Sequence, residues 1–214
     1  MKHQSITVGP FQENTYLVID EATNRAVLID PGDEAERIIA MVEKSGATLE
    51  AIWLTHGHID HIGGIAGVRR RWNVPVHMHP ADRPVFERGE EAAAEYEVDF
   101  EQPELPEHEV AEGNVMTLGT LNFDVLHLPG HSPGHVIYKN GDTVFGGDLL
   151  FAGSIGRTDL KYGDPEVMEE SLARIAEFDP ATTFHPGHGP STTIGVERMM
   201  NPFLSGVARI IKRR

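Results

Sequence analysis

Residues 55–61 read THGHIDH, which places four potential metal ligands within six residues: His56, His58, Asp60 and His61. An apolar run, residues 51–55, comes directly before this segment, and a stretch with helical spacing follows it, so the ligands are expected in a loop at a strand end. Asp60 and His61 point away from His56 and His58, so one tetrahedral ion cannot easily bind all four. Two ions that share the loop are the simpler arrangement.

Three further segments carry ligand types after apolar runs: PGHSPGH at 129–135, GGD at 146–148 and HPGHGP at 185–190. Their candidate side chains are His131, His135, Asp148, His185 and His188. Loops at the same edge of two packed sheets can converge, and Gly or Pro beside each candidate leaves room for close backbone packing. The spacing therefore predicts one site assembled from distant parts of the chain.

The composition narrows the chemistry of such a site. The 214 residues contain 12 His but no Cys, which excludes thiolate ligands, a cysteine nucleophile and disulfides. Eighteen Lys and Arg against 33 Asp and Glu give a net charge of −15, which opposes binding to nucleic acid and to anionic lipid. With no apolar signal core and no run of about 18 apolar residues, we expect a cytoplasmic protein with no membrane partner.

The elements that must position these loops form two similar halves. In the first half, strands are expected at 6–8, 16–20, 26–30, 51–55 and 75–79, and helices at 34–44 and 62–72. In the second half, strands are expected at 114–118, 121–128, 135–139, 143–145 and 182–184, and helices at 164–178, at 194–200 and from Pro202 onward. Stacking the two sheets buries a common core. We therefore predict an α+β fold, a four-layer αββα sandwich, with residues 1–214 as one domain.

The segment 87–112 is the most acidic part of the chain and contains Pro103 and Pro106. Such a run of like charge is usually exposed to solvent. We expect a solvated helix and loop here, with no role in ligand binding.

These motifs resemble those of the metallo-β-lactamase fold superfamily, whose H-x-H-x-D-H motif stands here at residues 56–61. The resemblance covers essentially the whole chain. It implies a first metal bound by His56, His58 and His131, and a second bound by Asp60, His61 and His188. It further implies that Asp148 bridges the ions and that Asp30, in the segment IDPG at 29–32, orients a ligand histidine.

The implied cofactors are two divalent ions, with zinc as the first expectation and iron or manganese as alternatives. Two such ions carry +4, and Asp60, Asp148 and a bridging hydroxide held by these carboxylates carry −3. The remaining positive charge polarises a carbonyl or phosphoryl oxygen. Metal binding lowers the pKa of water from about 15.7 to roughly 7, so no side-chain base is required.

Residues 147–151 (GDLLF) and 154–159 (SIGRTD) are similar to glyoxalase II, in its short single-domain bacterial type. That resemblance implies hydrolysis of a small-molecule thioester, S-lactoylglutathione, to lactate and glutathione, with Arg157 holding a glutathione carboxylate. The absence of Cys disfavours zinc β-lactamases that use a Cys ligand. Because the helical domain that completes the glutathione site in longer members has no counterpart after His188, thioester hydrolysis is better supported than glutathione specificity.

Two alternatives remain. The segment GRTD at 156–159 also resembles glutathione persulfide dioxygenases, which use a single iron at the equivalents of His56, His131 and Asp148. The complete second-metal set favours two ions over this alternative. A metal-binding module without catalysis is a weaker alternative, and no oligomeric state is predicted.

Overall fold

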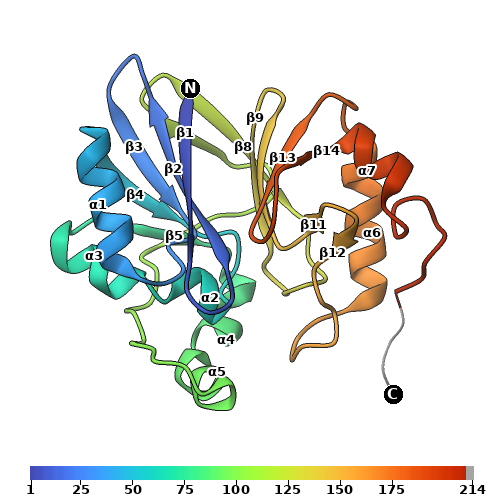
Figure 1. Cartoon of the computed structure of the whole chain (residues 1–214), viewed down its shortest axis with the longest axis horizontal. Helices are drawn as coiled ribbons and strands as arrows, with labels where there is room; N and C mark the ends of the chain where they lie inside the picture. Colours follow the sequence, from blue (N-terminus) through green and yellow to red (C-terminus); the bar gives the residue numbers. More distant parts are fainter. Residues whose placement is uncertain (211–214) are drawn as a thin grey trace.

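Two six-stranded sheets form the centre of the molecule in the computed structural model, which describes residues 1–210 (Figure 1). The first sheet has the order β1 (Lys2–Val8), β2 (Glu13–Asp20), β3 (Arg25–Ile29), β4 (Thr48–Trp53), β5 (Val76–Met78) and β6 (His108–Glu109). The second has the order β14 (Thr192–Thr193), β13 (Thr183–Pro186), β10 (Thr143–Gly147), β9 (Val136–Asn140), β8 (Leu121–His127) and β7 (Val115–Leu118). A small hairpin pairs β11 (Leu150–Phe151) with β12 (Ser154–Ile155).

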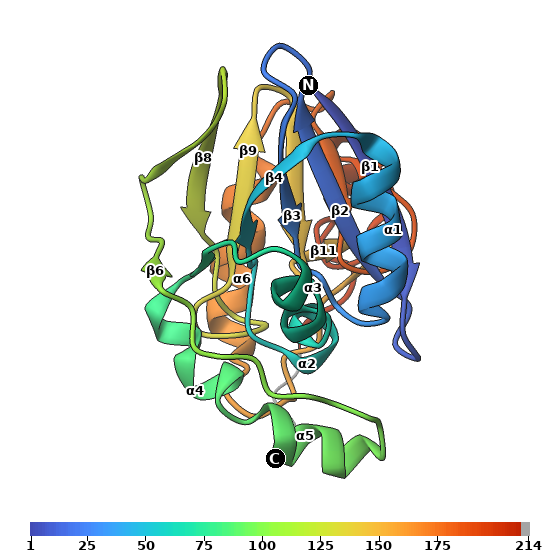
Figure 2. The same ribbon diagram turned by 90° about the vertical axis from the view of Figure 1, so that its left-hand side faces the viewer.

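Helices cover the outer face of each sheet, which confirms the predicted four-layer αββα sandwich (Figure 1). The first sheet is covered by α1 (Ala35–Ser45) and α3 (Ile65–Arg71), and the second by α6 (Pro165–Ala176) and α7 (Ile194–Met200). At one edge of the sandwich lie α2 (Ile59–Ile62), the 3-10 turn η1 (Pro80–Asp82), α4 (Arg83–Phe86) and α5 (Gly89–Tyr96) (Figure 2). None of the helices between residues 1 and 210 has the length and apolar character needed to cross a membrane.

Side-chain alternation along the strands separates three hydrophobic cores. On β2, Leu17 packs in the core under α1 and α3, whereas its neighbour Val18 packs between the sheets. On β9, Ile137 packs under α6 and Tyr138 packs between the sheets. Because successive residues of a strand face opposite sides of the sheet, each central strand contributes side chains to two cores. Trp53 of the first sheet lies 5.3 Å, centroid to centroid, from Tyr138 of the second, and burying each such side chain stabilises the fold by roughly 1.5–3 kcal/mol.

Strand direction explains why the candidate ligands gather at one edge. In the second sheet β8 and β10 are each antiparallel to β9, and β13 is parallel to β10, so these three strands end at the same edge. The loops that follow them carry His131, Asp148 and His188. In the first sheet, β4 is parallel to β3 and β5 and leads directly into the loop with His56.

The single helix predicted at 62–72 is wrong, because the helix is interrupted at Gly63 and Gly64. The chain forms α2 and α3 with Gly63 and Gly64 between them. A Cβ atom on Gly63 would lie 2.6 Å from the backbone oxygen of Gly32, and one on Gly64 would lie 2.9 Å from that of Pro31. The turn at Gly63 and Gly64 packs closely against the loop after β3, and the regular helix is therefore interrupted there.

The predicted helix from Pro202 is absent from residues 202–210, and residues 211–214 lie outside the described residues. Asn201 binds the backbone itself: its Oδ1 accepts from Phe203 N at 3.0 Å, and its Nδ2 donates to Ser154 O at 2.9 Å. Such side-chain bonds compete with helical ones. Gly206 then adopts a left-handed φ of 75°, which suits a turn rather than a helix interior.

Asp20 links the two sheets at the edge opposite the candidate ligands. Its Oδ2 accepts from Thr120 N and from Thr23 Oγ1, each at 2.7 Å. These hydrogen bonds lower the pKa of Asp20 to about 2, and the bond from Thr120 N has the largest effect. Because the folded pKa lies below the unfolded value of about 3.9, the stabilisation is present above pH 4 and is lost as the pH falls toward 2.

An Asp20→Asn variant is therefore expected to unfold at lower urea concentration than the wild type at pH 7. The difference should shrink at pH 3, because the wild-type carboxylate begins to protonate there. Urea titrations at the two pH values measure the unfolding midpoints of both proteins. Asp124→Asn, which changes an exposed aspartate on β8, is the control. Equal midpoints for Asp20→Asn and wild type at pH 7 would contradict the assigned role.

Candidate metal centre

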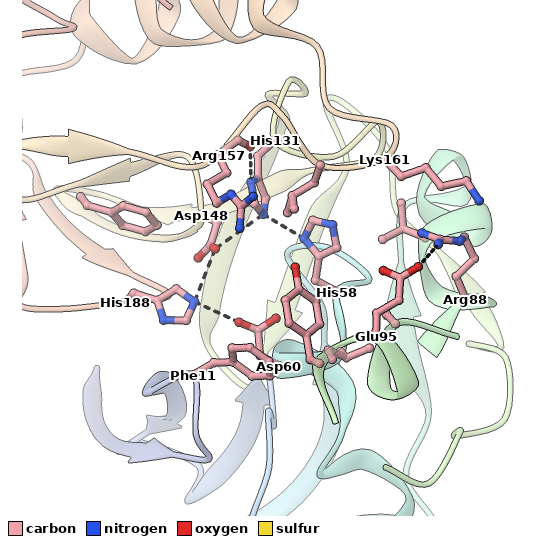
Figure 3. A pocket seen from close by; sticks show the side chains of 16 residues that line it. Phe11, His58, Asp60, Arg88, Glu95, His131, Asp148, Arg157, Lys161 and His188 are labelled. Carbon is pink, nitrogen blue, oxygen red and sulfur yellow. Dashed lines mark hydrogen bonds and ion pairs between the residues drawn. The ribbon is translucent and has the colours of Figure 1, made fainter. Parts of the chain in front are cut away.

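The seven predicted metal ligands lie together where the loops of both sheets meet. Figure 3 shows His58, Asp60, His131, Asp148 and His188 among them. Two groups have ligand atoms within 4.8 Å of one another: His56, His58 and His131, and Asp60, His61 and His188. Asp148 lies between the groups. Its Oδ1 is 3.4 Å from His61 Nε2, and its Oδ2 is 3.5 Å from His131 Nε2 and 3.4 Å from His188 Nε2.

Hydrogen bonds to the far ring nitrogens orient the histidines of the first group. His131 Nδ1 donates to the carbonyl of Arg157 at 2.7 Å, so His131 Nε2 faces the centre, 2.9 Å from His58 Nδ1. His56 Nδ1 lies 3.0 Å from Thr55 Oγ1, which leaves His56 Nε2 inward. Burial, aided by neighbouring His131, lowers the pKa of His58 to about 3. A neutral imidazole is the form that binds metal.

The second group pairs histidines with carboxylates. His188 Nε2 lies 3.1 Å from Asp60 Oδ2, and His61 Nε2 lies 3.9 Å from the same atom. Burial alone would lower the pKa of His188, but hydrogen bonds to Asp148 and Asp60 outweigh it and raise the value to about 10. The pKa of His61 is likewise raised, because Asp148, Asp60 and Asp30 outweigh its burial. The carboxylates of this group thus favour positive charge at its imidazoles, and a divalent cation could supply that charge.

Unpartnered polar atoms show that the residues present suit a metal. Within the described residues, the buried atoms His56 Nε2, His61 Nε2 and Asp148 Oδ1 make no hydrogen bond. Nearly all buried polar atoms in native proteins have partners, so three unpartnered atoms in one cluster are informative. Imidazole and carboxylate donors without thiolates suit zinc, iron or manganese. The cluster can therefore hold divalent metal ions.

Asp30, predicted to orient a ligand, lies behind the second group. Its Oδ1 accepts from Thr55 N at 2.7 Å, and its Oδ2 lies 3.0 Å from His61 Nδ1. Both oxygens of Asp30 thus have partners on the side away from the centre. One potential ligand atom from each of Asp30, His56 and His61 also lies within 4.8 Å of the others. The contact with Asp30 fixes the ring of His61 with Nε2 inward.

The remaining motif histidines lie around the cluster. His135 Nε2 accepts from Asp148 N at 3.1 Å and so helps to place that carboxylate. His127 Nε2 donates to Pro133 O at 2.8 Å, and His185 Nδ1 lies 2.7 Å from Ser191 Oγ. A Cβ atom on Gly187 would lie 2.2 Å from Asp148 Oδ1, which explains the glycine before His188.

Asp82 is a supporting residue that sequence reasoning missed. This fully buried carboxylate accepts from Gly57 N and Gly134 N, each at 2.6 Å, and from Ser132 Oγ at 3.0 Å. It therefore joins the loop that carries His56 and His58 to the loop that carries His131. No motif spacing marks Asp82 in the sequence, because its partners are distant along the chain.

Part of the segment 87–112, for which no role in ligand binding is predicted, lines a cavity over the cluster. A cavity of about 450 Å³ opens over the cluster, and Ala92, Glu95 and Tyr96 of α5 line it. α5 lies at the same edge of the sandwich as α2 (Figure 2). Arg157 lines the same cavity, with Nε 2.9 Å from Asp159 Oδ1. Phe11, Arg88 and Lys161 also line it and were not singled out from the sequence.

Comparison with known proteins agrees with this geometry. The family profile described as the metallo-beta-lactamase superfamily matches residues 8–192. A protein named hydroxyacylglutathione hydrolase GloC, from Haemophilus influenzae, is 38% identical over 210 residues, which cover 96% of this chain and 99% of that protein.

Two solved structures are similar throughout. TTHA1623 in a di-iron-bound form gives a TM-score of 0.88 at 46% identity and covers 94% of this chain and 100% of its own. The BLEG-1 B3 metallo-beta-lactamase gives a TM-score of 0.89 at 37% identity, and the match covers 96% of this chain and 100% of the BLEG-1 chain. Profile, sequence relative and structures agree with the resemblance seen in the ligand motifs, and the chain belongs to the metallo-β-lactamase superfamily.

Proposed function

We propose that this chain is a binuclear metal-dependent thioester hydrolase whose best-supported substrate is S-lactoylglutathione. The observation that carries this proposal is the complete second group, Asp60, His61 and His188, beside the first group and within reach of Asp148. In the dioxygenase alternative a single iron would be held by the equivalents of His56, His131 and Asp148. The relative named hydroxyacylglutathione hydrolase GloC supports the choice of thioester.

In this proposal His56, His58 and His131 would hold one ion, Asp60, His61 and His188 would hold the other, and Asp148 would supply a carboxylate between the two groups. Two bound ions, zinc first and iron or manganese as alternatives, would polarise a carbonyl oxygen and supply hydroxide at neutral pH. Uncharged histidine ligands leave the site net positive, which suits a substrate carbonyl that becomes an oxyanion.

In this proposal the residues that line the cavity bind the substrate. Phe11, Ile59 and Phe151 give the cavity apolar walls beside the cluster. Arg157 offers a planar guanidinium for a carboxylate on the thiol half of the thioester. Because an alkyl thiol has a pKa near 8.5, the product departs readily as thiolate, and the site needs no side-chain proton donor.

An Arg157→Ala variant is expected to raise KM for S-lactoylglutathione about tenfold, because a charge-assisted hydrogen bond is lost. Its kcat should stay within about twofold of wild type, since Arg157 does not contact the reacting carbonyl in this proposal. Steady-state kinetics measure both constants. Arg83→Ala, which removes an exposed arginine of α4 outside the cavity lining, is the matched control. A fall in kcat at unchanged KM would contradict the assignment.

The proposed function is tested by metal analysis together with activity on one purified sample. We expect two ions per chain and hydrolysis of S-lactoylglutathione. One iron per chain with oxygen uptake on glutathione persulfide would replace the proposal with the dioxygenase alternative. Hydrolysis of a β-lactam without thioester hydrolysis would replace it with the activity named for BLEG-1. Bound metal with none of these activities would leave a metal-binding module.

A further inference from the structure

His188 is held in a different way from three other candidate ligands. The far ring nitrogens of His56, His61 and His131 each lie within hydrogen-bond distance of a buried group. No hydrogen bond to the far nitrogen of His188 is present among residues 1–210, and its side chain is 25% exposed. Its near nitrogen faces the carboxylates of the cluster (Figure 3). The position of this ring therefore depends on the backbone of its own loop.

The loop that carries His188 has few restraints within its own sheet. Gly187 and Gly189 flank the histidine, and Gly189 has a left-handed φ of 74°. Gly187 N donates to Gly147 O at 2.8 Å. Because glycine has more accessible backbone conformations than any other residue, this loop needs further contacts to keep one conformation.

Strand β2 of the opposite sheet supplies these contacts. Asn14 N donates to Gly187 O at 2.7 Å. Asn14 Nδ2 donates to Gly189 O at 2.8 Å and to Pro186 O at 3.2 Å. Tyr16 stands two residues further along β2, on the same face of the sheet, and its hydroxyl donates to Pro186 O at 2.7 Å. One strand thus binds backbone carbonyls on both sides of the candidate ligand.

Thr7 on β1 fixes the orientation of the Asn14 amide. The two residues are directly opposite each other in the pairing of β1 with β2, and Thr7 Oγ1 donates to Asn14 Oδ1 at 2.9 Å. With its oxygen bound in this way, the amide turns Nδ2 toward the loop. Asn14 and Tyr16 are both buried. Loss of either donor would leave a carbonyl of the loop without that partner, away from water.

From these contacts we infer that Asn14 is a positioning residue for His188 and that Tyr16 assists it. Both side chains act through the backbone of the loop. The inference rests on the binuclear site of the proposed function and deepens it: β2 determines how tightly the ion at Asp60, His61 and His188 is bound.

Asn14→Ala tests the inference through zinc binding, measured by competition with a chelator of known affinity. We expect the wild type to bind two zinc ions. The variant is expected to bind one of them about 10–100-fold more weakly, the usual effect of losing a residue that orients a metal ligand. Its affinity for the other ion should be unchanged, because the inferred role concerns His188 alone.

Tyr16→Phe is a second test that does not depend on how well Asn14→Ala folds. It keeps the aromatic ring and removes one hydrogen bond to Pro186 O. Zinc binding at the same ion is expected to weaken about threefold, as the loss of a single hydrogen bond implies.

Asn140→Ala is the matched control. Asn140 is the last residue of β9, and its Nδ2 likewise donates to a backbone carbonyl, that of Asn122, at 2.7 Å. This bond joins β9 to β8 and involves no loop that carries a candidate ligand. Both zinc affinities of Asn140→Ala are expected to equal those of the wild type.

A His188→Ala background separates positioning from general stabilisation of the fold. If Asn14 acts through His188, Asn14→Ala causes no further loss of zinc affinity once His188 has been removed. A further loss in that background would overturn the inference. Equal weakening of both ions in Asn14→Ala, or unchanged zinc binding in both Asn14→Ala and Tyr16→Phe, would also overturn it.

The zinc titration separates this inference from the proposed function. If the wild type binds two zinc ions but hydrolyses no thioester, the proposed function fails while Asn14 keeps its role. If the wild type hydrolyses S-lactoylglutathione and Asn14→Ala binds both ions as tightly as the wild type does, the proposed function stands and the role of Asn14 is wrong.

Discussion

An Asp148→Ala variant is expected to lose thioester hydrolysis by on the order of a thousandfold and to retain fewer than two metal ions per chain. The reason is the position of this carboxylate, whose oxygens lie 3.4–3.5 Å from the inward nitrogens of His61, His131 and His188. Removing it takes a ligand from both ions and leaves the facing imidazoles without their anionic partner. His58→Ala is expected to cause a comparable loss by opening the first group alone.

Elemental analysis and kcat/KM on the same preparations measure this result. Asp142→Ala, at an exposed aspartate in the turn between β9 and β10, is the matched control and should keep both metal and activity. Near-normal turnover in either Asp148→Ala or His58→Ala would remove the basis for a metal-dependent hydrolase.

An Asp82→Asn variant is expected to bind its first metal ion about 10–100-fold more weakly, the usual effect of losing a residue that orients metal ligands. Asp82 receives hydrogen bonds from Gly57 N, Gly134 N and Ser132 Oγ. The Asn side chain has the same shape, but its NH2 group faces at least one of these donors and cannot accept its hydrogen bond. The loops that carry His58 and His131 are then held together less firmly.

Competition with a zinc chelator of known affinity measures the change. Thr193→Ala is a suitable comparison, because Thr193 caps the N-terminus of α7 by accepting from Val196 N. Its loss costs about 1 kcal/mol of stability, and its side-chain hydrogen bond does not involve a loop that carries a candidate ligand. If the two variants bind zinc equally well, Asp82 stabilises the fold without positioning the metal ligands.

The candidate ligands could be predicted from sequence because their chemistry is distinctive and each follows an apolar strand. His56 to His61 form a local motif, and His131, Asp148 and His188 each stand beside Gly or Pro at a strand end. Asp82 could not be found in this way. Its role depends on Ser132, which lies 50 residues further along the chain. An acidic helix such as α5 also has the composition of an ordinary solvated surface.

The sandwich itself could be predicted because alternation along strands such as β2 and β9 is a strong local signal. The elements that were not predicted correctly are short or depend on contacts with distant parts of the chain. β6 and β14 contain two residues each, too few to show any period. The break at Gly63 and Gly64 follows from their contact with the loop after β3, and the turn after Asn201 follows from the contact of Asn201 with Ser154.

Each of the two ligand groups takes members from both halves of the chain. His56 and His58 belong to the first half and His131 to the second, while Asp60 and His61 are joined by His188. Neither group is complete until the sheets dock, so the full set of ligands for either ion forms only when the two halves associate. Bound ions would then act as a clamp across the sandwich, and their concentration would set how firmly the halves stay together.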